Sequence, residues 1–514
     1  LFDWLRMLYA SMQYTVRHNN ELSAAFTAAM GILIGDPASP ILWLLYISDF
    51  ELDPHPDDVQ FSGRPVSHLE QADDVALISL SAQGMQLKLD QFERYCDSIF
   101  VLINTIKTLA AVHGPLPDPL PCLTLHGVRL RYVPTATYVG MTVSSTTHDI
   151  FTPHYAAKAQ TATRAANATM SLASYTGPLP PTVALQLYRS HVDPHLTAGC
   201  EVALDVRSTA LNDLLPIQST FLRRALNVSR RAQLPPLYTE TGIWPLQYRR
   251  FHLALRFLHY VLVTAPPLPL AAFHELWALS CTRQAPTWWT DLCLVGAALP
   301  VPVHIDPTVL PSADLVLALL PVLAASLATH LRLSVLQSKR LPVLQHRILR
   351  AAPLPSATLD FKAICAARPF LSLPRRRQRE AMTLLLFSEH PLAVEQLRRA
   401  PASTPIPRAW RVCRFCAVRT SVEDEEHVLL LCPADGPRAL RERFTAELLV
   451  AYPPLHRLLC RLPPAAVLDV LITSADPGPL PLFADYVADL FMLCSSTPLL
   501  IVSSEAAFRA LPPS

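Results

Sequence analysis

Apolar residues in the first part of the chain repeat at helical spacing in three places. Residues 5–12 form the first stretch, and an apolar run at 41–50 forms the second. Ser39 is placed as the N-cap of this second helix and Pro40 as its first residue. Residues 85–99 carry apolar side chains on one face, so they predict a third, amphipathic helix.

Short strand-like runs lie between and after these helices. Runs at 66–69 and 75–79 flank Gln71-Ala72-Asp73-Asp74, and this pattern predicts a hairpin with two acids at its turn. Runs at 123–125 and 128–132 predict a second strand pair. Adjacent carboxylates at the end of a sheet repel each other unless a cation shares them, and Mg²⁺ takes such oxygen ligands. A solvated acidic turn is the alternative interpretation.

From about residue 150 onward the pattern is helical, in segments that prolines separate. The longest apolar stretch, Leu315–Thr329, contains Pro321 and predicts a buried pair of helices. It is shorter than the ~20 residues that a membrane span needs. The motif Asp193-Pro194-His195 is interpreted as a turn.

Composition narrows the class of protein. The 514 residues predict three to four domains. A net charge of +2 with 51% hydrophobic residues excludes a disordered charged tail, and 13 glycines exclude collagen. The 43 basic residues comprise five lysines and 38 arginines. Arginine suits bidentate phosphate contacts, but a coding bias explains the excess equally well. The 11 cysteines are scattered apart from one cluster, which favours a reducing compartment.

That cluster has the pattern Cys413-x2-Cys416-x10-His427-x4-Cys432. Thiolates plus an imidazole at this spacing suit tetrahedral zinc, with the first pair on a knuckle and the second pair on one short helix. The alternative is four unrelated core residues.

Charged residues surround the cluster. Three arginines favour a surface that faces nucleic acid: Arg411, Arg414 and Arg419. The acidic run 423–426 opposes that interpretation and is expected to be a solvated loop and helix start.

Four motifs in the first 145 residues occur in a distinctive order. They are Gly31-x3-Gly35-Asp36-Pro37-x-Ser39-Pro40, Ala72-Asp73-Asp74, Ile103-Asn104-x2-Lys107-Thr108 and Tyr138-Val139-Gly140. Together they resemble the successive palm motifs of reverse transcriptases from non-LTR retrotransposons. A Cys-Cys-His-Cys cluster near the C-terminus is also what this resemblance leads one to expect.

The resemblance implies an α+β fold: a partial polymerase palm, with an antiparallel sheet and helices, followed by a mainly α-helical thumb and connector region and a small zinc knuckle. The expected domains are a palm at 1–145, a thumb-like region at 146–265, a connector at 266–400, a CCHC knuckle at 408–436 and a helical segment at 437–514.

The resemblance also implies roles for single residues. Asp73 and Asp74 are expected to be catalytic and to hold Mg²⁺, and Gly35 and Lys107 to lie near the incoming dNTP and the template. Residues on the primer side are expected to be Tyr138 and Gly140. The expected partners are an RNA template and a DNA primer or target. No membrane and no small-molecule cofactor beyond dNTP are expected, and the implied location is intracellular and nuclear.

The sequence departs from the family at several positions. Gln71 stands where the family usually has an aromatic residue, and Ile34 where it usually has glutamine. The family's first catalytic aspartate belongs on a strand upstream of the helix that opens this chain, and Asp3 lies too near Gly35 to replace it. The chain is therefore expected to be a fragment of a longer protein that is inactive as a polymerase. The alternative is a non-catalytic, zinc-containing nucleic-acid-binding protein derived from such an element.

Two groups of arginines are candidates for a template–primer groove, although an arginine run is also typical of a solvated helix face. The groups are Arg223, Arg224, Arg230 and Arg231, and Arg375, Arg376, Arg377 and Arg379.

Overall fold

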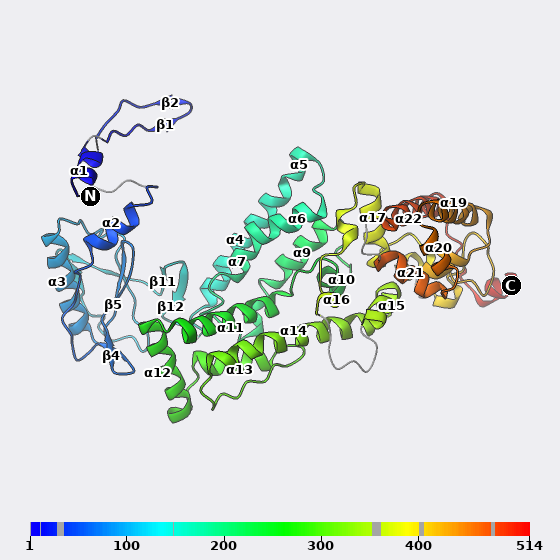
Figure 1. The fold of residues 1–514 in the computed structure, drawn as a ribbon. Coiled ribbons are helices and arrows are strands. Elements are labelled where there is room, and N and C mark those ends of the chain that lie inside the picture. Colours follow the sequence, from blue (N-terminus) through cyan, green and yellow to red (C-terminus); the bar gives the residue numbers. More distant parts are fainter. Residues whose placement is uncertain are drawn as a thin grey trace. The chain divides into compact units, whose positions relative to one another are not determined.

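A computed structural model describes residues 2–10, 12–27, 35–147, 149–351, 361–399, 406–473 and 478–513. The chain separates into two compact units, Leu1–Gly140 and Met141–Ser514 (Figure 1). The first combines short strands with helices, and the second is almost entirely helical. The predicted α+β class is thereby confirmed.

Strands of the first unit pair two at a time. β1 pairs with β2, β3 with β4, β5 with β6 and β8 with β9, all antiparallel, whereas β7 and β10 are parallel. The elements are α1 (Phe2–Ala10), β1 (Arg17–His18), β2 (Glu21–Leu22), α2 (Ser39–Tyr46), β3 (Val59–Phe61), β4 (Arg64–Val66), β5 (His68–Gln71), β6 (Asp74–Leu77), α3 (Ala82–Ser98), β7 (Leu109–Ala110), β8 (Thr124–Leu125), β9 (Val128–Arg129), β10 (Arg131–Tyr132) and β11 (Thr135–Tyr138).

The predicted cap of α2 is wrong. Ser39 is the first residue inside the helix. Ala38 occupies the N-cap position, and no side chain there accepts a hydrogen bond from the first turn. The Asp36 carboxylate instead accepts the Ala38 N–H at 3.1 Å, which fixes the turn ahead of the helix. By contrast, the Ser81 hydroxyl caps α3 by accepting the Gly84 N–H at 3.0 Å, so this helix begins earlier than its apolar face predicts.

The first unit has a small core. Leu89 of α3 packs against leucines of the β8–β9 region, and Phe50 contacts the rings of Phe92 and Tyr95 with centroids 5.4 Å and 4.8 Å away. Aromatic packing therefore fixes α3 against the segment that follows α2.

The second unit builds a large apolar core from many helices, in which α11 packs along α14 and α22 packs between α17 and α19 (Figure 1), and a small second cluster forms around Ala393, Leu397 and Ile406. Its elements are β12 (Met141–Ser144), α4 (Thr152–Ser171), α5 (Ala173–Thr176), α6 (Pro181–Leu187), η1 (Tyr188–Val192), α7 (Asp193–Thr197), α8 (Ser208–Leu211), α9 (Leu215–Ala225), α10 (Leu234–Thr239), α11 (Leu246–Thr264), α12 (Pro267–Arg283), α13 (Trp288–Ala297), α14 (Ala313–Leu336), α15 (Pro342–Ala351), α16 (Phe361–Ile364), η2 (Pro369–Ser372), α17 (Arg376–Leu386), α18 (Ala393–Arg399), η3 (Arg408–Trp410), η4 (His427–Leu431), α19 (Asp435–Ala451), α20 (Pro453–Leu459), α21 (Pro464–Thr473), α22 (Pro479–Ser496) and α23 (Glu505–Arg509).

Proline explains how these helices begin. It occupies the first turn of many of them, including α4, α6, α9, α12 and α22. The missing proline N–H costs nothing there, because the first N–H groups of a helix have no partner within it. The prolines between helical segments thus start helices as well as separate them.

The predicted helix pair at 315–329 is wrong. Residues Ala313–Leu336 form one helix, α14, with Pro321 inside it. Pro321 cannot donate a backbone hydrogen bond to the Leu317 carbonyl, yet the helix continues past it. Nor is it buried all round, since Leu317 and Val322 are each 50% exposed. By length and composition, α14 is one helix in the described residues that could cross a membrane, and α11 with α12 is a bent pair that passes the same test.

Candidate metal centre

The first two cysteines of the cluster lie on a tight knuckle. Val412 and Val422 form an antiparallel bridge, and the Cys413 N–H donates to the Ser421 carbonyl at 2.9 Å. The chain then turns back at Ala417, whose φ of +53° is left-handed and whose N–H donates to the Cys413 carbonyl at 2.9 Å. The knuckle therefore directs Cys413 and Cys416 to the same side.

The second pair of ligands lies on a π-helical turn. In η4 the Cys432 N–H donates to the His427 carbonyl at 2.7 Å, which is the i to i+5 bond of a π-helix. An α-helix would align His427 with the third or fourth residue after it, whereas this wider turn brings the fifth alongside. The x4 spacing between His427 and Cys432 and the π turn therefore match.

All four candidate ligand atoms lie within 4.8 Å of one another. The Cys413 and Cys432 sulfurs are 3.8 Å apart, and Cys416 Sγ lies 3.4 Å from His427 Nε2. A disulfide requires about 2.05 Å, so these thiols are unlinked. The predicted set is confirmed as a group that could hold a metal ion.

Without a metal ion, the electrostatics of the centre favour the thiolate form at Cys432 and the neutral thiol at Cys413 and Cys416. Donation to Cys432 and burial raise the pKa of Cys413 to about 12, whereas accepting that bond lowers the pKa of Cys432. Burial raises the pKa of Cys416. Backbone N–H groups favour the ionised form of each sulfur: those of Phe415 and Cys416 at Cys413, of Val418 at Cys416, and of Ala434 at Cys432. A cation would convert the remaining thiols into ligands.

The acidic run beside the centre is not solvated as predicted. Glu423 and Glu425 are buried, with 0% and 4% exposure. Glu423 accepts hydrogen bonds from the Arg414 guanidinium at 2.6 Å and from the Ala393 N–H at 2.7 Å. His390 Nε2 lies 3.0 Å from Glu425, and the hydrogen bond and charge of His390 outweigh burial and lower the pKa of Glu425. Arg414 and His390 offset the desolvation cost of burying Glu423 and Glu425, because each carboxylate has one of them as a partner.

The arginines around the knuckle bind the protein itself. Arg414 donates to the carbonyls of Cys494 and Thr497 at the end of α22, at 2.6 Å and 2.8 Å. Arg411 donates to the Val394 and Ile406 carbonyls. All three arginines that were predicted to face nucleic acid therefore bond to the protein in this structure, since Arg419 also donates to the Arg509 and Leu511 carbonyls.

The predicted acidic hairpin is confirmed in the first unit. β5 and β6 pair with Gln71 opposite Asp74, so Ala72 and Asp73 form a two-residue turn. Ala72 has a φ of +54°. Asp73 and Asp74 are exposed, and in the part of the chain that the structure describes neither belongs to a group of three potential metal ligands.

Tyr138, another predicted polymerase residue, lies close enough to this turn for the charge of Asp74 to affect its pKa. Burial raises the pKa of Tyr138, at the end of β11, and the negative charges of Asp74 and Glu70 raise it further. Lys107 lies in an exposed turn, with its N–H donating to the Asn104 carbonyl at 3.1 Å.

The two predicted glycines both have positive φ, at +90° for Gly35 and +76° for Gly140. Gly35 has open space where a side chain would stand. Gly31 and Ile34 lie outside the described residues.

Sequence reasoning missed a buried ion pair behind the hairpin. The Lys88 ammonium contacts Asp58, and their side chains are only 2% and 1% exposed. Lys88 also donates to the Ile78 carbonyl, directly after β6. Burial raises the pKa of Asp58, but its bonds to Lys88 and the His55 N–H outweigh burial and lower it. The only signal available was Lys88 on the apolar face of α3, next to Leu89.

The predicted groove arginines differ in their contacts. Arg375 and Arg377 pair with Asp485, Arg376 with Glu380, and Arg379 donates to the Leu373 carbonyl, so the second group is committed within the protein. In the first group, Arg223 bonds to the Ala232 carbonyl. Three members make no ion pair among the described residues: Arg224, Arg230 and Arg231.

Asp193-Pro194-His195 is not a turn, because it begins α7 directly after η1. The Asp193 carboxylate lies 3.4 Å from the Arg249 guanidinium and accepts a hydrogen bond from the Tyr188 hydroxyl. Burial raises the pKa of Asp193. These contacts give the motif a structural role at the join of two helices.

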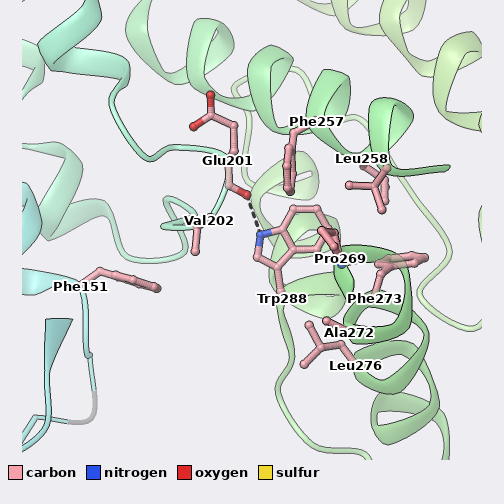
Figure 2. A pocket seen from close by; sticks show the side chains of 11 residues that line it. Phe151, Glu201, Val202, Phe257, Leu258, Pro269, Ala272, Phe273, Leu276 and Trp288 are labelled. Carbon is pink, nitrogen blue, oxygen red and sulfur yellow. Dashed lines mark hydrogen bonds between the residues drawn. The ribbon is translucent and has the colours of Figure 1, made fainter. Parts of the chain in front are cut away.

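An apolar cavity of about 320 Å³ lies among α11, α12 and α13 (Figure 2). Phe257, Phe273 and Trp288 line it, and the Trp288 indole N–H donates to the Glu201 carbonyl at 2.9 Å. Figure 2 shows the Glu201 carboxylate directed away from the Trp288 ring. The cavity therefore presents hydrophobic surface rather than catalytic groups.

A second group of potential ligands lies at Glu93, Asp97 and His126 in the first unit. Glu93 and Asp97 lie one turn apart on α3, and His126 is 3.4 Å from Glu93. The group is partly exposed, and the His126 N–H also donates to Glu93 at 2.6 Å. An ordinary ion pair with a backbone hydrogen bond accounts for this geometry.

No protein-family model matches this chain, and no curated protein matches it.

Proposed function

We propose that this chain is a nucleic-acid-binding part of a reverse transcriptase of the non-LTR retrotransposon type. The observation that carries the proposal is the Asp73–Asp74 hairpin, because its tight turn presents two adjacent, exposed carboxylates and Tyr138 lies within reach of the Asp74 charge. In this proposal residues 1–145 are a partial palm, and the helical region that follows is the thumb and connector.

The hairpin fits one part of a two-metal site. Bound Mg²⁺ would activate a primer hydroxyl and neutralise the charge of a triphosphate. Asp73 and Asp74 would supply carboxylate oxygens, Gly35 and Lys107 would lie near the nucleotide, and Tyr138 and Gly140 near the primer. Two ions about 4 Å apart need carboxylates from a second place as well. We therefore propose that these 514 residues bind a primer–template without extending the primer.

Primer extension tests the catalytic part of this proposal. The purified chain, supplied with Mg²⁺, dNTP and an RNA template annealed to a DNA primer, is expected to bind the hybrid and leave the primer unextended. Extension by the chain that Asp73→Ala abolishes would contradict the proposed inactivity.

The binding part is supported by arginines of α4 and α9. Arg224 donates to Asn167 of α4 at 3.2 Å, and Arg164 lies one turn before Asn167 on the same face. Arg230 and Arg231 follow α9, and no ion pair neutralises any of these four guanidinium groups among the residues described. Exposed guanidinium groups without an ion pair suit contact with a phosphate backbone.

A salt series tests this surface. Affinity for an RNA–DNA hybrid should fall steeply with salt, and Arg224→Gln should both weaken binding and reduce the slope by roughly one phosphate contact. Arg376→Gln is the matched control, because Glu380 already neutralises Arg376 at 2.7 Å. An affinity that does not change with salt concentration would mean that these arginines do not contact the phosphate backbone.

The Cys3His group fits zinc by its donor set. Three sulfurs and one imidazole nitrogen in reach of a common centre suit a tetrahedral structural ion. We propose that zinc holds the knuckle together, and that the resident ion serves structure rather than catalysis.

The alternative is a non-catalytic, zinc-containing nucleic-acid-binding protein derived from such an element. Among the described residues, no third potential ligand lies beside Asp73 and Asp74, and this favours the alternative, because a solvated acidic turn needs no cation. Asp73→Asn separates the two: unchanged affinity for the hybrid in the presence of Mg²⁺ favours the alternative, and weakened affinity favours the palm. Either protein would act inside the cell, in the nucleus.

A further inference from the structure

A short segment of the chain, residues 505–513, lies over the metal knuckle and is called here the capping segment. The ring of Phe508 stacks on Trp410, with centroids 5.9 Å apart and planes 24° apart. Arg419 donates to the carbonyls of Arg509 and Leu511, at 2.7 Å and 2.8 Å. The Arg419 N–H also donates to the Pro512 carbonyl at 2.8 Å.

These contacts use the chemistry by which proteins hold single-stranded nucleic acid. Single strands are bound through base stacking on aromatic rings and through phosphate contacts from arginine and backbone N–H groups. The Phe508 ring stacked on Trp410 is a contact of the same kind as a base stacked on an aromatic ring. The three carbonyl oxygens around Arg419 are acceptors of the same kind as phosphate oxygens.

The knuckle holds Trp410 and Arg419, which contact the capping segment, in fixed positions. Trp410 precedes Cys413 and Arg419 follows Cys416, and the Val412–Val422 bridge sets the two arms of the knuckle side by side. Arg419 also keeps a spare donor, because its Nε has no hydrogen-bond acceptor among the described residues. A ligand with more acceptor oxygens than the capping segment would satisfy it.

The capping segment itself is weakly held. Its helix α23 contains no buried residue, and only Phe508 and Leu511 are half-buried. The Arg509 side chain pairs with Glu505 inside the segment and so adds nothing to docking. A segment with so few buried apolar contacts opens locally at low cost.

We propose that the capping segment occupies a binding surface for single-stranded nucleic acid, formed by Trp410 and Arg419 on the metal knuckle, and blocks it until a strand displaces it. This inference rests on the proposed function, since it names the strand-binding surface of the same protein. It assigns Trp410 and Arg419 to nucleic acid, while Arg411 and Arg414 stay committed to the protein.

Oligonucleotide binding to the full chain tests the inference. The probe is a fluorescent 12-nucleotide oligo(dT) or oligo(U), titrated with metal-loaded protein. Phe508→Ala should raise affinity about tenfold, the order expected when one base gains an aromatic ring to stack on. Adding Trp410→Ala to this variant should remove the gain. Arg509→Ala is the matched control and should change nothing, because the Arg509 backbone carbonyl makes the contact.

Amide hydrogen exchange shows whether the segment has been released. If Phe508→Ala leaves the segment protected, Phe508→Ala with Leu511→Ala is titrated instead. Unchanged oligonucleotide affinity with a released segment overturns the inference. If the wild type binds the RNA–DNA hybrid in that case, the proposed function survives. If no variant and no wild-type protein binds any nucleic acid while the metal content is intact, both proposals fail.

Discussion

At the hairpin turn, Asp73 and Asp74 face water, whereas at the metal centre Glu423 and the sulfurs of Cys413 and Cys432 are buried. The hairpin carboxylates keep their hydration and need no partner. The buried groups have lost theirs, so each depends on another group: Glu423 on Arg414, and the sulfurs on one another, on His427 and on backbone N–H groups. Exposed charge leaves a site free to bind and adds little to stability, while buried charge makes the surrounding fold depend on every partner.

The largest expected effect is the loss of the metal. Cys416→Ser, or a chelator, should release one equivalent of zinc and destabilise the region 406–513 by about 10 kcal/mol, the order of structural zinc binding. Elemental analysis measures the metal, and hydrogen exchange at Cys413 and Ser421 measures the knuckle. Cys460→Ser is the control, because Cys460 is exposed and outside the cluster. Stoichiometric zinc in Cys416→Ser would defeat the assignment.

Loss of the buried carboxylate should come next. Glu423→Gln leaves the Arg414 charge buried without a counter-charge, at an expected cost of about 3–5 kcal/mol. Exchange of the Ala393 and Arg414 N–H groups, which both donate to Glu423, should rise accordingly. Glu426→Gln supplies the comparison, since Glu426 is only half-buried. Equal effects of the two substitutions would mean that the ion pair does not hold these segments.

These two sites show what the sequence could predict. The ligand spacing predicts the metal cluster because knuckle and helical turn are local, within 20 residues of chain. The roles of Glu423 and Arg414 were missed because Arg414 reaches Cys494 and Thr497, about 80 residues away. Nothing in an acidic run tells whether a distant helix end covers it. The hairpin register was predictable from alternation around the turn, but not the Lys88–Asp58 pair behind it.

Breaking the Lys88–Asp58 ion pair of the first unit is expected to cost less stability than either change at the metal centre. Lys88→Met leaves Asp58 buried and unpaired, at an expected cost of about 3 kcal/mol near neutral pH. The exchange of β5 and β6 amides measures it, because Lys88 holds the Ile78 carbonyl at the end of β6. Arg94→Met on the same helix is the control. If the hairpin amides of the two variants exchange alike, the pair does not anchor the hairpin.

The pair also predicts a pH dependence with a definite sign. The pKa of Asp58 is lowered in the folded chain, so its contribution is fully present above the ordinary value near 4 and is lost as pH falls through the lowered folded value. The hairpin amides of the wild type should therefore exchange faster relative to the intrinsic rate below about pH 4. Lys88→Met should lack this loss, because Asp58 can protonate at little cost once its partner is gone. An identical acid response in both proteins would contradict the interpretation.

The smallest expected effect lies at the hairpin turn itself. Ala72 holds a φ of +54°, where an L-residue pays about 1–2 kcal/mol and glycine does not. Glycine costs about 0.5–1 kcal/mol in chain entropy, so Ala72→Gly should stabilise the hairpin by about 0.5–1 kcal/mol. Ala76→Gly, in the extended strand β6 opposite Leu69, brings the entropy cost without relief and should destabilise it by a similar amount. Slower exchange of the hairpin amides in Ala72→Gly and faster exchange in Ala76→Gly would show that Ala72 is strained. Such strain is expected where a turn must present Asp73 and Asp74 at a fixed angle. Faster exchange in both variants would mean that the turn is an ordinary connection without strain at Ala72.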